Sequence, residues 1–450
     1  MIHQYKNNGY NIVMDVCSGA IHVVDDVTYD VIALYEEKSL EEIENELSYS
    51  KEDIEEAYKE VTSLKEEGLL FTEDIYEDYI KEVKSRKTVV KALCLHIAHD
   101  CNLACRYCFA EEGEYKGHRE LMSAKVGKAA LDFLVANSGN RHNLEVDFFG
   151  GEPTMNFGVV KEVVEYGRSL EEKHNKHFRF TLTTNGVLLN DEIMEFANKE
   201  MDNVVLSVDG RKEIHDYMRP TRNGKPSYDL IMPKFIRFAE SRHQQKYYVR
   251  GTFTNRNLDF SKDVLHLADL GFEQISMEPV VGQPEEPYAI QEKDLPQIFD
   301  EYDRLAKEMI KREKAGKGFN FFHFMIDING GPCVAKRLSG CGSGCEYLAV
   351  TPWGDFYPCH QFVGNEDFLM GNVDDGIVRP DIRDMFKNSN VYSKEKCKNC
   401  FAKFYCSGGC AANSYNFHGN INDAYDVGCE LQKKRIECAI MIRAAMAEEE

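Results

Sequence analysis

The chain of 450 residues is 43% hydrophobic and 29% charged, and its formal net charge at pH 7 is −22. This is the composition of a soluble globular protein, and the length is too great for a single hydrophobic core, so we expect two or three domains. Nucleic acids and anionic membranes are bound through basic surfaces, so the acidic balance argues against both as partners.

What the cysteines of this chain indicate depends on the cellular compartment of the protein. No segment near the N-terminus resembles a signal peptide, and no run of eighteen apolar residues occurs. We therefore expect a cytoplasmic protein, neither secreted nor membrane-spanning. In a reducing compartment the 15 cysteines indicate metal or iron–sulfur ligation rather than disulfide bonds.

Residues 1–85 are predicted to form a small α+β unit. Two short strands, Tyr10–Met14 and Ala20–Val24, precede three helical patterns, two of which begin with capping signatures. Leu69–Phe71 is expected as a further strand. The order of elements resembles a winged helix, and the charged segment 75–91 is expected to be a linker helix.

The charge of this unit decides what a winged helix could bind here. Residues 1–85 contain 22 acidic and 7 basic residues, a net charge of −15. DNA binding, the usual function of a winged helix, requires the opposite sign. We therefore expect another kind of partner.

Residues 86–312 are predicted to form an α/β domain. Strand-like and helix-like patterns alternate six times, which is typical of a parallel sheet covered by helices. The expected strands are Leu93–Ile97, Leu144–Phe149, Phe178–Thr184, Val204–Val208, Tyr247–Thr254 and Gln274–Pro279. We expect a curved, partial (β/α)6 barrel that binds ligands at the carboxyl ends of its strands.

Three cysteines, Cys101, Cys105 and Cys108, directly follow the first barrel strand. Their thiolates can surround one metal centre, and a CxxxCxxC spacing with an aromatic residue, Tyr107, before the last cysteine is typical of a [4Fe–4S] site. The alternatives are a zinc site and unrelated core cysteines. Structural zinc sites use four ligands, and no further Cys or His completes this loop in the usual paired spacing.

With this motif, residues 92–312 resemble the radical S-adenosylmethionine (SAM) superfamily. The resemblance implies that the three cysteines hold a [4Fe–4S] cluster whose fourth iron binds the amino and carboxylate groups of SAM. An electron from the cluster would then cleave SAM into methionine and a 5′-deoxyadenosyl radical. The cofactor carries this chemistry and the protein positions it.

Further motifs at the strand ends are expected to contact SAM. Gly150 and Gly151 permit a close backbone approach, and Glu152 can accept a hydrogen bond from an ammonium group; the resemblance assigns this motif to the SAM amino group. The other candidate contacts are Tyr107, Thr184, Asn185, Ser207, Asp209 and Arg219. Polar turns and helix caps are the alternative for most of these residues, and pairing with the acidic surface is the alternative for Arg219.

Residues 313–450 hold 10 of the 15 cysteines and show little regular pattern. A zinc ribbon would explain the CxxC and CxxxC pairs alone. The complete arrangement instead resembles the SPASM domain of radical SAM peptide maturases, which implies two auxiliary [4Fe–4S] clusters and three clusters in all. The resemblance assigns Cys397, Cys400, Cys406 and Cys429 to one auxiliary cluster, and Cys341, Cys359 and Cys410 to the other.

The fourth ligand of the second set stays open at this point. Cys345 and Cys333 are both candidates, and neither lies at the spacing expected for the family. If both are structural, one iron is open to substrate. Cys17, Cys94 and Cys438 lie in apolar contexts and are expected in the core.

Taken together, the three regions resemble the thioether-forming, sactisynthase-like maturases of Cys-rich SCIFF peptides. The resemblance implies a Cys-rich precursor peptide whose leader docks on residues 1–85 as an added strand. The deoxyadenosyl radical would remove a hydrogen atom from the acceptor residue, and a substrate thiolate held on the auxiliary cluster would couple to that carbon. Reduced flavodoxin or ferredoxin is the expected electron donor, in an anaerobic setting.

Other functions remain open on the sequence. Anaerobic sulfatase maturation, which makes formylglycine, uses a similar cluster set, but that family has an acidic base where this chain has His360, and residues 1–85 would be superfluous to it. A carbon–carbon-coupling or decarboxylating peptide maturase is another enzymatic alternative. A non-catalytic electron-transfer or zinc protein would leave the Gly150–Glu152 motif and the first cysteine triad without a purpose.

Overall fold

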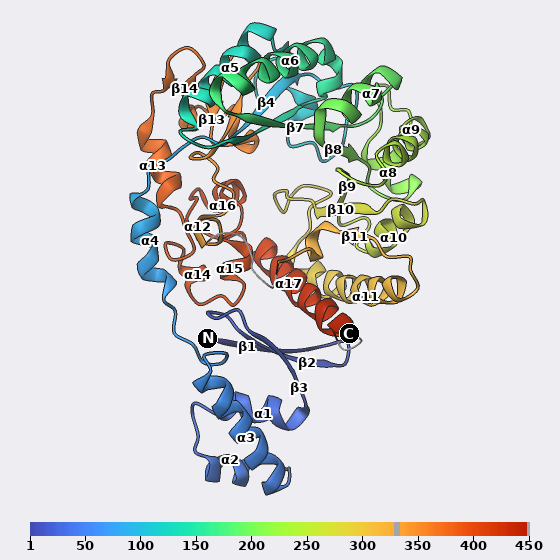
Figure 1. Cartoon of the computed structure of the whole chain (residues 1–450). Coiled ribbons are helices and arrows are strands. Elements are labelled where there is room, and N and C mark those ends of the chain that lie inside the picture. Colours follow the sequence, from blue (N-terminus) through green and yellow to red (C-terminus); the bar gives the residue numbers. More distant parts are fainter. Residues whose placement is uncertain (328–333, 448–450) are drawn as a thin grey trace.

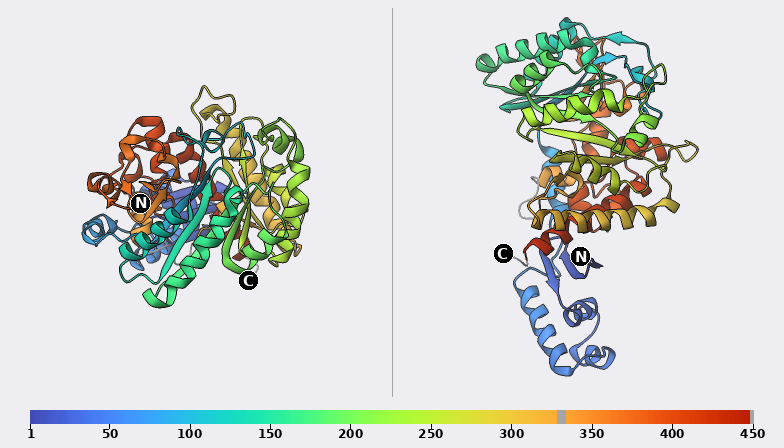
Figure 2. Two further views of the ribbon diagram at one scale, coloured as in Figure 1. Left: turned by 90° about the horizontal axis from the view of Figure 1, so that it is seen from above. Right: turned by 90° about the vertical axis from the view of Figure 1, so that its right-hand side faces the viewer.

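The computed structural model describes residues 1–327 and 334–447. Figure 1 shows an N-terminal unit, a curved sheet covered by helices, and a C-terminal region that closes the ring of elements. The views of Figure 2 show an elongated molecule, from which the N-terminal unit projects at one end.

The N-terminal sheet contains one strand more than expected. β1 (Ile2–Asn7), β2 (Tyr10–Asp15) and β3 (Ile21–Val24) form an antiparallel sheet in the order β1-β2-β3. β1 was not expected because most of its residues are polar. The strand expected at Leu69–Phe71 is wrong: Phe71 has a φ of 57°, which no strand residue adopts.

Three helices pack on this sheet: α1 (Asp26–Leu34), α2 (Leu40–Glu46) and α3 (Lys51–Glu66). The capping box of Ser39 and Glu42 is present at the start of α2. The unit has its own small core, which includes Val13, Val31, Ile43, Ile54 and Val61. The expected linker helix is α4 (Tyr76–Ser85).

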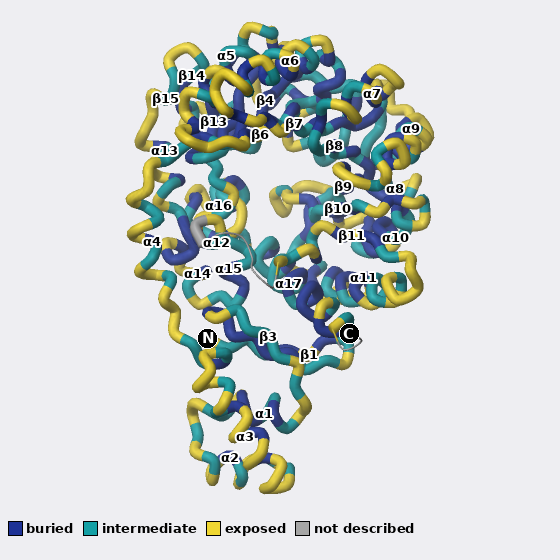
Figure 3. Tube along the Cα trace, in the orientation of Figure 1, coloured by how far each residue is buried: buried dark blue, intermediate teal, exposed yellow. Residues whose placement is uncertain are grey.

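The six strands expected for the barrel are all confirmed. β4 (Ala92–His99), β6 (Asn143–Gly150), β7 (His177–Thr184), β8 (Met201–Ser207), β9 (Tyr247–Phe253) and β10 (Gln274–Pro279) are neighbours in this order, and all pair in parallel. Alternate residues of β7 are buried, whereas every residue of the central strand β4 is buried. Figure 3 shows buried residues along these strands. The covering helices are α5 (Ala124–Asn137), α6 (Phe157–His174), α7 (Asp191–Glu200), α8 (Lys212–Met218), α9 (Tyr228–Ser241), α10 (Ser261–Asp269) and α11 (Leu295–Lys314).

The C-terminal region has more regular structure than its sequence suggests. β12 (Tyr347–Val350) pairs in parallel with β4 and extends the barrel sheet. β13 (Asp355–Tyr357), β14 (Gly371–Asn372) and β15 (Gly376–Ile377) continue it, and with the short strands β5 (Glu120–Leu121) and β11 (Asn320–Phe321) the sheet has 12 strands. The helices here are α12 (Val334–Ser339), α13 (Pro380–Asn388), α14 (Glu395–Lys398), α15 (Lys403–Cys406), α16 (Ala411–His418) and α17 (Asp426–Ala447).

The N-terminal sheet rests on the C-terminal region. The ring of His3 stacks on Phe401 with centroids 3.4 Å apart, and His3 Nε2 lies 3.0 Å from a carboxylate oxygen of Glu437 in α17. Tyr5 donates its hydroxyl to the carbonyl of Glu437 at 3.0 Å. Figure 1 shows α17 between this sheet and the barrel. Within the described residues, no helix is both long and apolar enough to span a membrane.

Candidate functional site

The first cysteine triad lies in a loop directly after β4. Cys101, Cys105 and Cys108 are each partly buried. The sulfur of Cys101 accepts hydrogen bonds from the backbone amide of Leu103 at 3.5 Å and from Asn185 Nδ2 at 3.6 Å. Burial raises the pKa of Cys101 to about 11 and that of Cys105 to about 12. These thiols therefore stay protonated until a metal centre displaces the protons.

Two glycines after β6 fix the backbone next to this loop. A Cβ atom on Gly150, which has a φ of 118°, would lie 2.5 Å from the carbonyl oxygen of Ala98. A Cβ atom on Gly151 would lie 2.2 Å from the carbonyl oxygen of Asp100. Only glycine allows this approach, so both residues bring the end of β6 against the start of the cysteine loop.

Glu152 is buried and bonded to the next strand end. One carboxylate oxygen accepts from the backbone amide of Thr154 at 3.0 Å, from Thr154 Oγ1 at 2.5 Å and from Thr184 Oγ1 at 2.8 Å. The other accepts from the backbone amide of Asn185 at 2.7 Å. Burial raises its pKa, and these hydrogen bonds oppose the shift. Glu152 thus holds the turn that presents Asn185 to Cys101.

Tyr107, Asp209 and Arg219 tie the cysteine loop to the end of β8. The Tyr107 hydroxyl donates to both carboxylate oxygens of Asp209, at 2.9 and 2.7 Å. Arg219 Nη1 donates to the Tyr107 oxygen at 2.9 Å and lies 3.4 Å from Asp209 Oδ1. Arg219 is therefore paired inside the protein rather than with its acidic surface. Ser207, the last residue of β8, is partly exposed beside them.

Buried polar atoms without a partner lie around this loop. Within the described residues they include Asn102 Nδ2, Arg219 Nε, His96 Nε2 and His99 Nδ1. A buried donor without an acceptor is costly, so a ligand that carries acceptor groups fits the space beside the thiols. The amino acid part of SAM has such groups, and the residues present fit this cofactor and a cluster bound by three cysteines.

The C-terminal cysteines form two groups. One group contains Cys397, Cys400, Cys406 and Cys429. Burial, together with the repulsion that neighbouring thiolates would exert, raises the pKa of Cys406 to about 12 and that of Cys429 to about 11. Cys410 and Cys341 likewise lie close enough to Cys359 to add to burial in raising its pKa. The structure thus brings together the sets that the sequence assigned to two auxiliary clusters.

Cys345 lies in the turn after Cys341, where the backbone amide of Gly344 donates to the carbonyl of Pro358, next to Cys359, at 2.9 Å. The Cys345 thiol donates to the backbone carbonyl of Arg383 at 3.3 Å, and its strongest charged neighbours are Arg383 and Glu346. Cys333, the other candidate ligand, lies outside the described residues.

The three cysteines expected in the core are buried. Cys94, in β4, is a neighbour of Cys359, which its apolar sequence context did not indicate.

The described residues do not form a single-ion site. Within residues 1–327 and 334–447, no group of three or more His, Cys, Asp and Glu side chains is arranged to hold one metal ion. A cubane cluster requires a wider spacing of the cysteine sulfur atoms than a single ion does, because each cysteine binds its own iron.

A layer of aromatic and imidazole rings connects the first triad with Cys359. The ring of His360 lies 5.7 Å from Phe109 and 5.2 Å from Phe149. His96 and His99 are fully buried and share a hydrogen bond of 2.9 Å between Nδ1 and Nε2. Sequence reasoning missed this layer; the available signal was a polar His96 inside an otherwise apolar strand.

Comparisons with known proteins agree with this geometry. Residues 95–242 match the Radical SAM superfamily. The chain is 26% identical over 355 residues to a cysteine-type anaerobic sulfatase-maturating enzyme of Clostridium novyi, with 75% of this chain and 92% of that protein covered.

Two solved structures share the fold. Native anSMEcpe with bound AdoMet aligns with a TM-score of 0.65 and 20% identity, covering 80% of this chain and 99% of that one. Streptococcus suis SuiB bound to precursor peptide SuiA aligns with a TM-score of 0.53 and 16% identity, covering 95% and 98%. The part of the chain at residues 95–242 is thus similar to the Radical SAM superfamily, and the whole chain shares the mixed α/β fold of these two structures.

Proposed function

We propose that the chain is a peptide maturase that joins a cysteine sulfur of a Cys-rich precursor peptide to a carbon atom of another residue. The observation that carries the proposal is the contact of His360 with Phe109 and Phe149. His360 directly follows Cys359, Phe109 directly follows Cys108, and Phe149 directly precedes Gly150. One aromatic wall therefore separates the expected SAM site from the expected auxiliary cluster.

Formation of the C–S bond is an oxidation of the peptide. Joining an S–H and a C–H group into a C–S bond releases two hydrogen atoms. When bound, SAM and its cluster supply a carbon radical that takes one of them. The other leaves as a proton and an electron, and the electron needs an acceptor close to the new bond. In this proposal, a cluster held by Cys359, next to His360, would be that acceptor.

The chain's own residues position SAM. Tyr107, Asp209 and Arg219 fix the cysteine loop against β8, and Glu152 fixes the turn at Thr184 and Asn185. In the proposed complex, Arg219 Nε and Asn102 Nδ2 donate to SAM, which removes two buried unpartnered donors.

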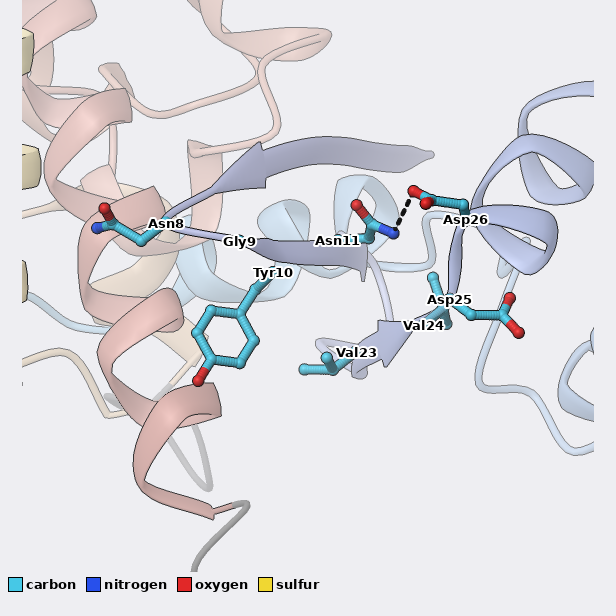
Figure 4. Close-up of a pocket in the computed structure, with 8 residues that line it drawn as sticks. All are labelled: Asn8, Gly9, Tyr10, Asn11, Val23, Val24, Asp25 and Asp26. Atoms are coloured by element: carbon cyan, nitrogen blue, oxygen red, sulfur yellow. Dashed lines mark hydrogen bonds between the residues drawn. The ribbon is translucent and has the colours of Figure 1, made fainter.

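The free edge of the N-terminal sheet is the proposed docking site for the leader. Among the residues that the structure describes, β3 pairs only with β2, whereas the opposite edge strand, β1, lies against α17. A cavity of about 540 Å³ opens at the end of β3, lined by Asn8, Gly9, Tyr10, Asn11, Val23, Val24, Asp25 and Asp26 (Figure 4). Asp26 pairs with Lys6 at 2.8 Å and Asp25 caps α1, and the acidic character of this end of the sheet suits a basic residue next to an extended leader segment.

Mass spectrometry tests the thioether proposal. The enzyme is co-expressed anaerobically with a Cys-rich precursor peptide encoded beside its gene. Each thioether lowers the peptide mass by two hydrogen atoms and removes one cysteine from alkylation by iodoacetamide. A peptide that keeps all its alkylatable cysteines and its mass would refute the proposal.

Formylglycine formation is the second candidate, and the match to the sulfatase-maturating enzyme favours it. A cysteine-containing sulfatase peptide is the matching substrate. Its product carries an aldehyde that reacts with a hydrazide probe, whereas a thioether does not. Aldehyde formation from this peptide, together with no change in the Cys-rich peptide, would reverse the ranking.

A further inference from the structure

A cationic patch lies on the outer side of the cysteine loop. Arg106 stands between Cys105 and Tyr107 in the sequence, and its backbone amide donates to the carbonyl of Met218 at 2.9 Å. Its side chain donates from Nε to the carbonyl of Tyr217 at 2.7 Å. The guanidinium carbon lies 4.5 Å from the centre of the Tyr217 ring.

A second arginine reaches the same ring. The guanidinium carbon of Arg256 lies 4.4 Å from the centre of Tyr217. Tyr217 is 40% exposed, and both arginines are exposed. Neither arginine has an ion-pair partner among the residues that the structure describes. Two like charges on one exposed ring repel each other, and an anion bound between them relieves the repulsion.

The patch borders a cavity of about 290 Å³. Its lining is formed by Arg106, Tyr217, Met218, Arg256, Pro287 and Tyr288. Glu286, in the loop of residues 280–291, forms a hydrogen bond with Tyr288. Two arginines thus line this cavity on a protein whose net charge is −22.

We propose that Arg106, Tyr217 and Arg256 dock the acidic surface of the one-electron donor protein that reduces the cluster at the first cysteine triad. The proposal rests on the proposed radical SAM chemistry. The donor is oxidised by one electron, the cluster is reduced by one electron, and no bond forms between the two proteins.

Three arguments favour this occupant. The overall charge of the chain repels an acidic donor, so productive approach is confined to a local positive patch. Arg106 is covalently next to Cys105, so a protein seated on its side chain lies close to that cysteine. Encounters between electron-transfer partners use small, charge-steered interfaces, and a small exposed cavity with two arginines matches that pattern.

The test compares two electron sources for the full-length, cluster-loaded enzyme. Arg256→Glu is the variant, because no hydrogen bond of its side chain holds the fold within the described residues. Lys173→Glu is the control, since it makes the same charge change at an exposed residue at the end of α6. The rate of 5′-deoxyadenosine formation is measured with purified, photoreduced flavodoxin over a range of concentrations, and separately with dithionite.

We expect Arg256→Glu to raise the flavodoxin concentration at half-maximal rate about 10-fold and to leave the dithionite rate unchanged. Added salt should slow the flavodoxin-driven rate of the wild type more than that of the variant. Arg106→Gln should act in the same direction.

Several outcomes would overturn the proposal. Equal flavodoxin dependence of Arg256→Glu and Lys173→Glu would remove the docking role. A loss of the dithionite-driven rate in Arg256→Glu would assign the patch to the SAM site instead. A raised KM for the peptide under dithionite would assign it to the substrate. Failure of the radical SAM chemistry itself is distinguishable, because the wild type would then form no deoxyadenosine with dithionite, and failure of thioether formation alone would appear only in the peptide mass.

Discussion

Asn185 donates a side-chain hydrogen bond to the sulfur of Cys101 at 3.6 Å. The same amide nitrogen donates to Asn102 Oδ1 at 2.7 Å, and the backbone amide of Asn185 is held by buried Glu152. A residue at the end of β7 thus reaches across β6 to the loop after β4. The hydrogen bond fits a sulfur atom that carries negative charge as a cluster ligand.

Asn185→Ala should make the cluster harder to reduce, because donors to a ligand sulfur stabilise the extra negative charge of the reduced state. The expected result is a lower reduction potential in an EPR-monitored redox titration, with unchanged iron content. Asn198→Ala, at an exposed residue of α7, is the control. An unchanged potential in Asn185→Ala would show that this hydrogen bond has no influence on the cluster.

Cys105→Ala should abolish SAM cleavage and leave the C-terminal iron sites intact. The two C-terminal groups of cysteines share no residue with the loop after β4. Reconstituted wild type should contain about twelve irons per chain and the variant about eight. Iron analysis and deoxyadenosine formation under dithionite measure both effects. About four irons in the wild type, or stoichiometric zinc, would refute the three-cluster proposal.

His215 should make the protein less stable in mild acid. His215 is fully buried, accepts the backbone N–H of Asp209 at 3.3 Å and is 2.9 Å from Ser227 Oγ. Burial, helped by Arg219 and Lys212, lowers its pKa from 6.5 to about 2. It therefore stays neutral in the folded state, whereas the unfolded chain binds a proton below pH 6.5.

Because only the unfolded chain binds this proton, the free energy of unfolding falls as the pH drops through 6.5. The loss from this one residue is about 2 kcal/mol at pH 5. His215→Gln should lose about 2 kcal/mol less than the wild type between pH 7 and pH 5, in urea unfolding at each pH. Exposed His142→Gln is the control. Equal losses in His215→Gln and the wild type would contradict the prediction.

The leader should bind at β3. Val23 is 44% exposed on this edge strand, beside the carboxylates of Asp25 and Asp26. Val23→Arg removes apolar contact and adds a charge that repels a basic leader, so we expect the Kd of the full-length enzyme for a labelled leader peptide to rise about 10-fold. Leu188→Arg, at another exposed apolar residue, is the control, and fluorescence anisotropy measures both. Tighter binding of duplex DNA than of the leader at physiological salt would reverse the interpretation of the whole unit.

The barrel and the cysteine loop could be predicted from the sequence because their signals are local. Each barrel strand shows its own apolar pattern, and Cys101, Cys105 and Cys108 lie within one short loop. The pairing of β12 with β4 joins residues more than 250 positions apart, and no local pattern encodes it. β1 was not predicted because its polar side chains face α17 and solvent. The strand predicted at Leu69–Phe71 does not form, because Phe71 has a positive φ.

For the site residues, too, the sequence predicted the residue types but not their partners. The residue types of Glu152, Asp209 and Arg219 indicated a polar site, but each has its own protein partners. Those partners come from other strands, so the sequence could not distinguish a SAM contact from a residue that holds one in place.

The last prediction concerns the cluster of Cys341, Cys359 and Cys410. The thiol of Cys345 donates to the carbonyl of Arg383 at 3.3 Å, a hydrogen bond that a cluster ligand could not make. We therefore expect Cys345→Ala to keep its full iron content and its crosslinking activity, with only a modest loss of stability from the vacated packing volume. Cys359→Ala, the positive control, should lose about four irons per chain.

The number of protein ligands on this cluster affects how the crosslink can form. A cluster with only three protein ligands leaves one iron free for a substrate thiolate, which would stay deprotonated and fixed close to the acceptor carbon. Cys333→Ala should then also keep iron and crosslinking. The opposite result is equally clear: loss of about four irons and of crosslinking in Cys345→Ala or Cys333→Ala, while deoxyadenosine still forms, would mean a fully ligated cluster that serves only for electron transfer.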